Sequence, residues 1–198
     1  ITGEIEVFET MAALDTKAKD AGVMLMPGTG FDVVPSDCLA AHMKRRMPDA
    51  VELTLAFQAI GRPSRGTATT MTENIHKGGA VRRDGKITPV PSAWKTMSID
   101  FGSGPVEVMT IPWGDVSTAY YSTGIPNIQV YMAAPKQLQS MAKMSRYLGW
   151  LMASAPVQAI LKKQIQSGPP GPSDEERRKG KSLLWAEVRN KSGKPIHT

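Results

Sequence analysis

The sequence predicts a fold of the α/β (α+β) class: a short α/β segment, then a mixed, mostly antiparallel sheet with helices on one face. Three observations predict it. Residues 4–48 follow the order helix, apolar run, glycine-rich turn, helix. After residue 50, apolar and polar residues alternate in short segments, as in strands with one face on a core. Turn sequences separate several of these segments closely enough for hairpins.

The first fifty residues predict two helices around a short strand. Residues 4–21 carry apolar side chains at helical spacing, and Gly22 ends that helix. Residues 23–26 are apolar without interruption, which predicts a buried strand of a parallel sheet, although parallel partners are not obvious downstream. Residues 35–47 form the next predicted helix, with proline in its first turn and Pro48 after its end.

The rest of the chain alternates strands, turns and helices. Residues 168–181 are predicted to be a loop in which 175–179 form an exposed segment, and residues 136–147 and 155–165 are predicted to be helices with Met and Leu facing inward. The remaining predicted elements are a strand at 51–59, a helix at 66–77, hairpin turns at 84–85 and 102–104, a strand at 127–133, a strand at 183–190 and a turn at 192–193 that leads into its partner strand.

The composition is that of a globular protein with one domain or slightly more. Of 198 residues, 41% are hydrophobic and 21% are charged, so a genuine core is expected. Cys38 is the single cysteine, which excludes an intramolecular disulfide and favours a reducing, cytoplasmic location. The net charge of +6 comes from dispersed basic residues, so we expect no nucleic-acid binding.

The longest uncharged apolar stretch, residues 147–161, is shorter than the roughly 20 residues that a membrane-spanning helix needs. We expect a buried helix there, and surface attachment to a membrane is the alternative. Four basic residues and one tryptophan in and near this stretch allow two interpretations. They could form a basic aromatic surface, or they could lie on ordinary solvated helix faces. They are Lys143, Arg146, Lys162, Lys163 and Trp150.

Residues 28–37 read GTGFDVVPSD and form the first candidate site. Gly28 and Gly30 match the first two glycines of a dinucleotide-binding fingerprint, but Val33 stands where the third glycine belongs, and no acid closes the next strand. We therefore do not expect the main pyrophosphate site here. A tight strand-to-helix turn is one interpretation. The other is a ligand site at the helix start, where Asp32 would orient an amide or accept a proton; Asp32 and Asp37 could instead cap the helix.

The second candidate site is residues 64–70, SRGTATT. A basic residue, a glycine and hydroxyl groups at a predicted helix start fit an anion site, and an ordinary N-cap with a solvated Arg65 fits equally well. The three histidines share no metal-ligand spacing, so no metal site is expected. Cys38 is interpreted as a small buried side chain; the alternative is a thiolate stabilised near a helix start.

Residues 28–37 also carry a family resemblance. The stretch GFDVVPSD resembles a signature of the saccharopine dehydrogenase-like oxidoreductases, which include the trans-acting enoyl reductases. Supporting matches are ITGE at 1–4, SRGTA at 64–68, GPSDEERR at 171–178 and LWAE at 184–187.

The resemblance implies that residues 1–50 are the end of a Rossmann domain and that residues 51–198 are a substrate and dimerisation domain. Both ends look cut, because the family's glycine-rich fingerprint and first five strands are absent and the last hairpin is incomplete. The resemblance places Gly28, Gly30, Phe31 and Asp32 at the nicotinamide end of the cofactor. It places Pro35, Ser36 and Asp37 at the helix that crosses to the second domain, and Arg65, Gly66 and Thr67 facing the cleft.

The expected function is therefore that of an NAD(P)-dependent oxidoreductase acting on a small-molecule substrate as a homodimer. No catalytic acid or base is assigned, and the chain alone is expected to bind NAD(P) poorly and to be inactive. The alternative is a non-catalytic α+β module that dimerises or binds a lipid or protein partner.

Overall fold

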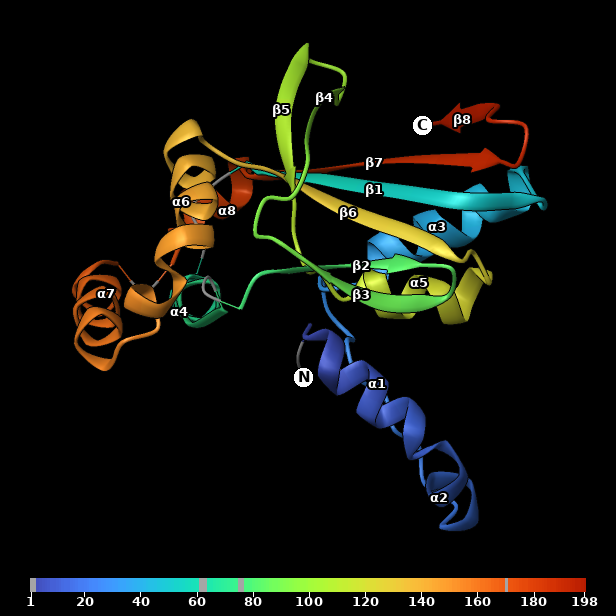
Figure 1. Ribbon diagram of the computed structural model, residues 1–198, viewed down its shortest axis with the longest axis horizontal. Coiled ribbons are helices and arrows are strands. Elements are labelled where there is room, and N and C mark those ends of the chain that lie inside the picture. Colours follow the sequence, from blue (N-terminus) through green and yellow to red (C-terminus); the bar gives the residue numbers. More distant parts are fainter. Residues whose placement is uncertain (1–2, 61–63, 75–76, 170) are drawn as a thin grey trace.

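The structure, a computed structural model, describes residues 3–60, 64–74, 77–169 and 171–198 (Figure 1). Eight strands form one sheet in the order β3-β2-β6-β1-β7-β8, and β5 also pairs with β6 and carries β4 on its other side. They are β1 (Ala50–Ile60), β2 (Gly79–Arg83), β3 (Lys86–Val90), β4 (Thr96–Asp100), β5 (Pro105–Thr110), β6 (Asn127–Ala133), β7 (Lys181–Asn190) and β8 (Pro195–His197).

The sheet is mixed and mostly antiparallel, as predicted. Strands β1 and β6 run parallel, with Leu53 opposite Ile128 and Leu55 opposite Val130. The other strand pairs among the described residues are antiparallel. The predicted turn at 84–85 joins β2 to β3, and Asp84 and Gly85 both have positive φ, at 47° and 77°, as a two-residue hairpin requires.

Eight helices accompany the sheet in the described ranges. They are α1 (Ile5–Ala13), α2 (Asp15–Asp20), α3 (Val34–Arg46), α4 (Arg65–Asn74), α5 (Asp115–Thr123), α6 (Lys136–Met152), α7 (Ala155–Ser167) and α8 (Asp174–Lys179). Helices α3 and α5 pack against each other and on the sheet, where Met43 and Val116 are completely buried in the main core with Leu53, Leu55 and Ile128.

Two groups of helices project from this core (Figure 1). Helices α1 and α2, with residues 21–27, form an N-terminal arm that extends away from the sheet. Helices α4, α6 and α7 form a helical lobe beside the sheet, in which α4 and α6 each contact α7. Within the described residues, no helix is both long and apolar enough to cross a membrane.

The predicted strand at 23–26 is wrong. These residues form no strand, and Met24 and Met26 are 79% and 64% exposed. A strand needs a neighbour to satisfy its backbone groups, and in the described part of the chain no strand lies beside this segment. The predicted helix at 4–21 is also divided, because it breaks at Leu14 between α1 and α2.

Three further predictions about burial and loops are corrected. The stretch 147–161 is not a buried helix: α6 ends at Met152, α7 begins at Ala155, and no residue of α7 is buried. Cys38 is exposed, because the buried face of α3 follows Ser36, Ala40 and Met43 instead. The predicted loop 168–181 contains α8, which begins with a reciprocal capping box between Ser173 and Glu176.

Candidate functional site

The turn from Gly28 to Val33 connects the N-terminal arm to α3, and its shape is set by packing. Gly28 has φ +66°, and a Cβ atom there would lie 2.7 Å from the Phe8 ring. Val33 has φ 116° and is 5% exposed, an unusual backbone conformation for a β-branched residue. The Val34 amide donates to the Gly30 carbonyl at 3.2 Å and closes the turn. A tight turn is therefore present at Gly28 and Val33, but the strand-to-helix interpretation is wrong about what precedes it, because residues 23–26 form no strand.

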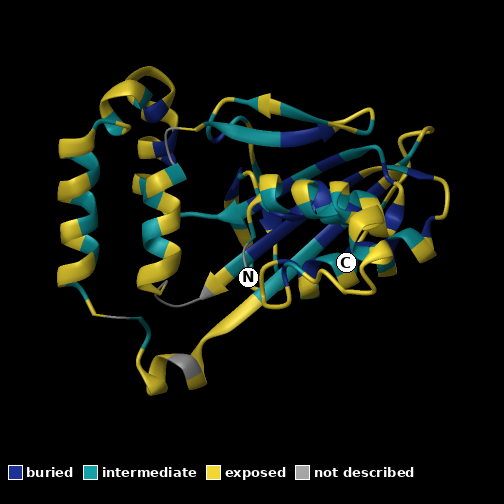
Figure 2. Cartoon of the chain, turned by 90° about the horizontal axis from the view of Figure 1, so that it is seen from below, coloured by how far each residue is buried: buried dark blue, intermediate teal, exposed yellow. Residues whose placement is uncertain are grey.

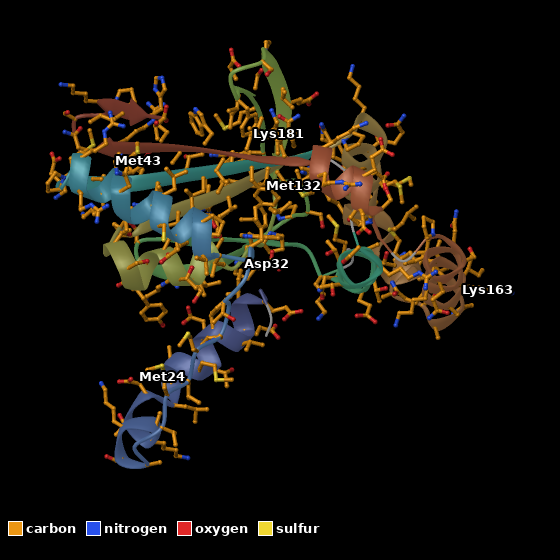
Figure 3. The ribbon with its side chains drawn as sticks, turned by 180° about the vertical axis from the view of Figure 1, so that it is seen from behind. Met24, Asp32, Met43, Met132, Lys163 and Lys181 are labelled. Atoms are coloured by element: carbon orange, nitrogen blue, oxygen red, sulfur yellow. The ribbon has the colours of Figure 1, made fainter. Side chains whose placement is uncertain are left out.

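Gly30, Phe31 and Asp32 form the exposed side of this turn. A Cβ atom at Gly30 would have no other atom within 4 Å, so its backbone faces open space. Phe31 is 43% exposed and touches Phe57 edge-on, with ring centroids 6.2 Å apart, and Phe57 in turn packs on the indole of Trp113, with ring centroids 4.8 Å apart. Asp32 lies where the arm meets the start of α3 (Figure 3). The turn thus offers open backbone, an aromatic ring and a carboxyl group side by side.

Neither predicted capping role is observed at the start of α3. Its N-cap residue is Val33, and no side chain caps the helix. Asp37 instead accepts a hydrogen bond of 2.6 Å from the Ser122 hydroxyl on α5. Partial burial raises the pKa of Asp32, and the negative charge of Glu4 adds a smaller effect in the same direction. Ser36 is buried and donates to the Val33 carbonyl at 3.2 Å, so it faces the protein interior and not a cleft.

Asp115, which the sequence analysis did not select, is the most unusual carboxyl group of this region. It is the first residue of α5 and is completely buried, and its two oxygens lack a well-aligned hydrogen-bond partner among the described residues. Burial raises its pKa to about 7; the nearby carboxyl groups of Asp37 and Asp32 act in the same direction, and polar contacts with the Ser36 hydroxyl and with the backbone amide of Asp115 lower it in part. Near neutral pH this carboxyl therefore exchanges a proton.

The starts of α3 and α5 meet at this point. A Cβ atom at Gly114 would lie 2.7 Å from Val33 and 2.7 Å from Phe8, so the N-termini of both helices and α1 are in close contact. Helix N-termini favour negative charge, and three carboxyl groups gather there: Asp32, Asp37 and Asp115. In the sequence, a single acidic residue after Trp113-Gly114 is typical of an ordinary helix start, so nothing there indicates that Asp115 is buried.

A second polar network lies next to this site and joins the arm to the sheet. The buried Arg82 donates to Glu9 at 2.9 Å, to the Val116 carbonyl at 2.8 Å and to the Gly85 carbonyl at 2.7 Å, and its guanidinium lies 4.3 Å from the centre of the Tyr120 ring. Glu9 also accepts hydrogen bonds from the hydroxyls of Ser117 and Tyr121. The network satisfies the buried guanidinium and holds α1 on α5.

Arg65, Gly66 and Thr67 lie in a different environment from residues 28–33. Ser64 accepts a hydrogen bond of 3.2 Å from the Thr67 amide, which supports the N-cap interpretation. The Arg65 guanidinium is not simply solvated, because it donates to the Gly168 carbonyl. Helix α4 packs against α7, whereas the turn packs against Phe8 and Gly114. The structure therefore does not bring the two predicted parts of one cleft together.

A groove of about 830 Å³ lies between the N-terminal arm and α5. Of the predicted site residues, Asp37 lines it, together with Thr118, Tyr121 and Ser122 on the same side. The arm supplies an apolar wall that includes Met11, Val23 and Leu25. The described residues contain no cluster of histidine, cysteine and acidic side chains that could hold a metal ion.

Neither the family models nor the curated proteins that were searched contain a match to this chain.

Proposed function

We propose that this chain is part of an NAD(P)-dependent oxidoreductase of the cytoplasm that acts on a carbonyl, imine or enoyl substrate as a homodimer. Residues 1–50 would border the cofactor, and residues 51–198 would form the substrate and dimerisation region. The observation that carries the proposal is the turn 28–33, in which packing fixes Gly28 and Val33 and leaves Gly30, Phe31 and Asp32 exposed. Its sequence is also the stretch that resembles the saccharopine dehydrogenase-like family.

The turn fits the nicotinamide end of the cofactor and does not fit the pyrophosphate. Val33 fills the position that the third glycine of a phosphate-binding turn would leave open. The carboxyl groups of Asp32 and Asp37 would repel a phosphate, whereas a carboxyl of raised pKa can exchange hydrogen bonds with a carboxamide. When bound, the cofactor supplies the hydride. Gly30 would allow close approach, Phe31 would pack beside the ring, and Asp32 would orient the amide.

The proposal makes a direct claim about the gene. Sequencing of the DNA upstream of the Ile1 codon is expected to show, in frame, a strand, a Gly-x-Gly-x-x-Gly turn and a helix. The protein from that complete reading frame should then oxidise NADPH in the presence of an enoyl or carbonyl substrate. A start codon directly before Ile1 would contradict the proposal, because no pyrophosphate site would then be encoded.

The role of the turn is tested in the same full-length protein with Gly30→Val. Because Gly30 faces open space, we expect an unchanged melting temperature and a KM for NADPH raised at least about tenfold, the loss of about 1.4 kcal/mol of binding. Thr29→Val is the matched control, since Thr29 is exposed in the same turn. An unchanged KM in Gly30→Val would show that the turn does not approach the cofactor.

A further inference from the structure

The helical lobe exposes apolar side chains along α6. Met141 and Met144 are three residues apart on one face of the first part of the helix, and Leu148 and Leu151 repeat that spacing from the kink at Leu148, where φ is −112° and ψ is 19°. All four are exposed, and the adjacent Tyr147 and Trp150 are 81% and 74% exposed. We call these six residues the α6 apolar face. In Figure 2, the lobe at the left is largely coloured as exposed.

Helix α6 turns its polar side inward. The residues that it buries are Gln139, Ala142 and Ser145, and Gln139 is satisfied by a hydrogen bond of 2.9 Å to the Ala134 carbonyl. A helix that packs only on its own protein normally buries its apolar side. On α7, Ile160 is likewise 66% exposed. Exposed apolar side chains thus gather on α6 and are joined by Ile160 of α7, and a surface of this kind is typical of a binding site.

The charged residues near this apolar surface indicate which kind of partner it would contact. Residues 116–173 contain no aspartate or glutamate, while α6 and α7 carry five basic residues. Lys162 is paired with Glu73 of α4, and Arg146 donates to the backbone carbonyls of Ser92 and Ala93. Lys136, Lys143 and Lys163 are exposed. The α6 apolar face is therefore bordered by positive charge without nearby acids on its own helices.

We propose that the α6 apolar face, with Ile160 and the lysines beside it, docks on an anionic membrane surface. Tryptophan and tyrosine prefer the boundary between lipid headgroups and acyl chains, and lysine places its methylene groups along apolar surface while its charge stays among the headgroups. Lys136, Lys143 and Lys163 would contact anionic lipids, each strengthening the attachment several-fold. The helices would lie on the membrane and not cross it, which would hold the rest of the molecule beside lipid.

The test is co-sedimentation of the full chain with vesicles. We expect binding to phosphatidylcholine vesicles containing about one-third phosphatidylserine, and binding at least about tenfold weaker both at 0.5 M salt and to pure phosphatidylcholine. Tyr147→Ser with Trp150→Ser should weaken binding at least about tenfold, because both exposed rings would be lost. Their circular dichroism spectrum should stay unchanged, since neither ring is buried.

Matched controls separate a specific docking surface from general adhesion. Val23→Ser with Met24→Ser removes exposed apolar groups from the arm, and should leave vesicle binding unchanged. Lys143→Glu with Lys163→Glu should abolish binding to the anionic vesicles, whereas Lys191→Glu with Lys194→Glu, which changes the net charge equally in the exposed β7–β8 turn, should not.

Three results would overturn the proposal. The first is no binding to the anionic vesicles. The second is binding that the Tyr147 and Trp150 substitutions leave intact. The third is concentration-dependent dimerisation that the same substitutions abolish in a chain that ignores vesicles, which would make the α6 apolar face an interface between two copies.

Discussion

Asp115 shows how a single buried group can link the stability of a protein to pH. Its carboxyl is completely buried and its oxygens lack well-aligned hydrogen-bond partners among the described residues, so folding favours the neutral acid. The pKa is raised from 3.8 to about 7 in the folded protein. Between these values the folded protein holds a proton that the unfolded chain releases, and the free energy of unfolding must fall as pH rises. Above about pH 7 both states are ionised and the decline from this group ends.

We predict that Asp115→Asn removes most of this decline. The full effect of Asp115 is about 4 kcal/mol, because each pKa unit corresponds to about 1.4 kcal/mol. Urea unfolding at pH 5 and pH 8 should show a smaller difference in the free energy of unfolding for Asp115→Asn than for the wild type.

Asp20→Asn is the control for this experiment. Asp20 is an exposed acid at the end of α2, and its substitution should leave the pH dependence as in the wild type. An equal slope in Asp115→Asn and wild type would show that the Asp115 carboxyl is ionised in the folded protein throughout this range.

At the scale of elements, the sequence predicts those strands and turns that depend on the local pattern of residues alone. The alternation in 51–59 and 127–133 gives β1 and β6 almost to the residue, because a strand with one face on the core must alternate. The turn at 84–85 follows from the positive φ that Asp-Gly tolerates. The apolar run 23–26 misleads, because apolar character becomes a buried strand only beside other strands.

The same limit applies to the candidate site and to the helical lobe. The turn at 28–33 is visible in the sequence because glycines mark it. Asp115 is not visible, because its burial depends on α3 and α1 meeting α5 at Val33, Phe8 and Gly114. Likewise, the spacing in α6 predicts the helix, but the prediction that its Met side chains face inward is wrong: Met141 and Met144 are exposed, and the structure turns Ser145 inward.

The hydrogen bonds of Arg82 attach α1 to the rest of the molecule. Arg82→Ala should lower the free energy of unfolding by about 3 kcal/mol, because it leaves Glu9 and the carbonyls of Val116 and Gly85 without their donor. Arg83→Ala at the next position should cost less than about 1 kcal/mol, since Arg83 is exposed and rests on the Trp94 ring, 4.6 Å from its centre. Urea unfolding of both variants measures the difference. Equal costs would mean that the Arg82 network does not hold the arm in solution.

At the scale of the whole molecule, the buried core is confined to the sheet with α3 and α5, and two projections carry exposed apolar surface. The main core includes Met43 of α3, which is completely buried. Met24 lies away from this core, along the N-terminal arm (Figure 3). Burial of a methionine in such a core contributes about 2 kcal/mol, whereas an exposed methionine contributes little to stability and promotes association.

The last prediction separates these two roles of methionine. Met24→Lys with Met26→Lys should leave the melting temperature unchanged and lower self-association at high concentration, because both side chains are mostly exposed in the folded chain. Met43→Lys, in contrast, buries an unpaired charge and should unfold the protein. Thermal unfolding and sedimentation at several concentrations measure both effects. A clear drop in the melting temperature of the arm variant would show that residues 23–26 are covered in solution. A drop that shrinks when both proteins are diluted would mean that a second copy covers them, and a drop independent of concentration would mean that their own chain does.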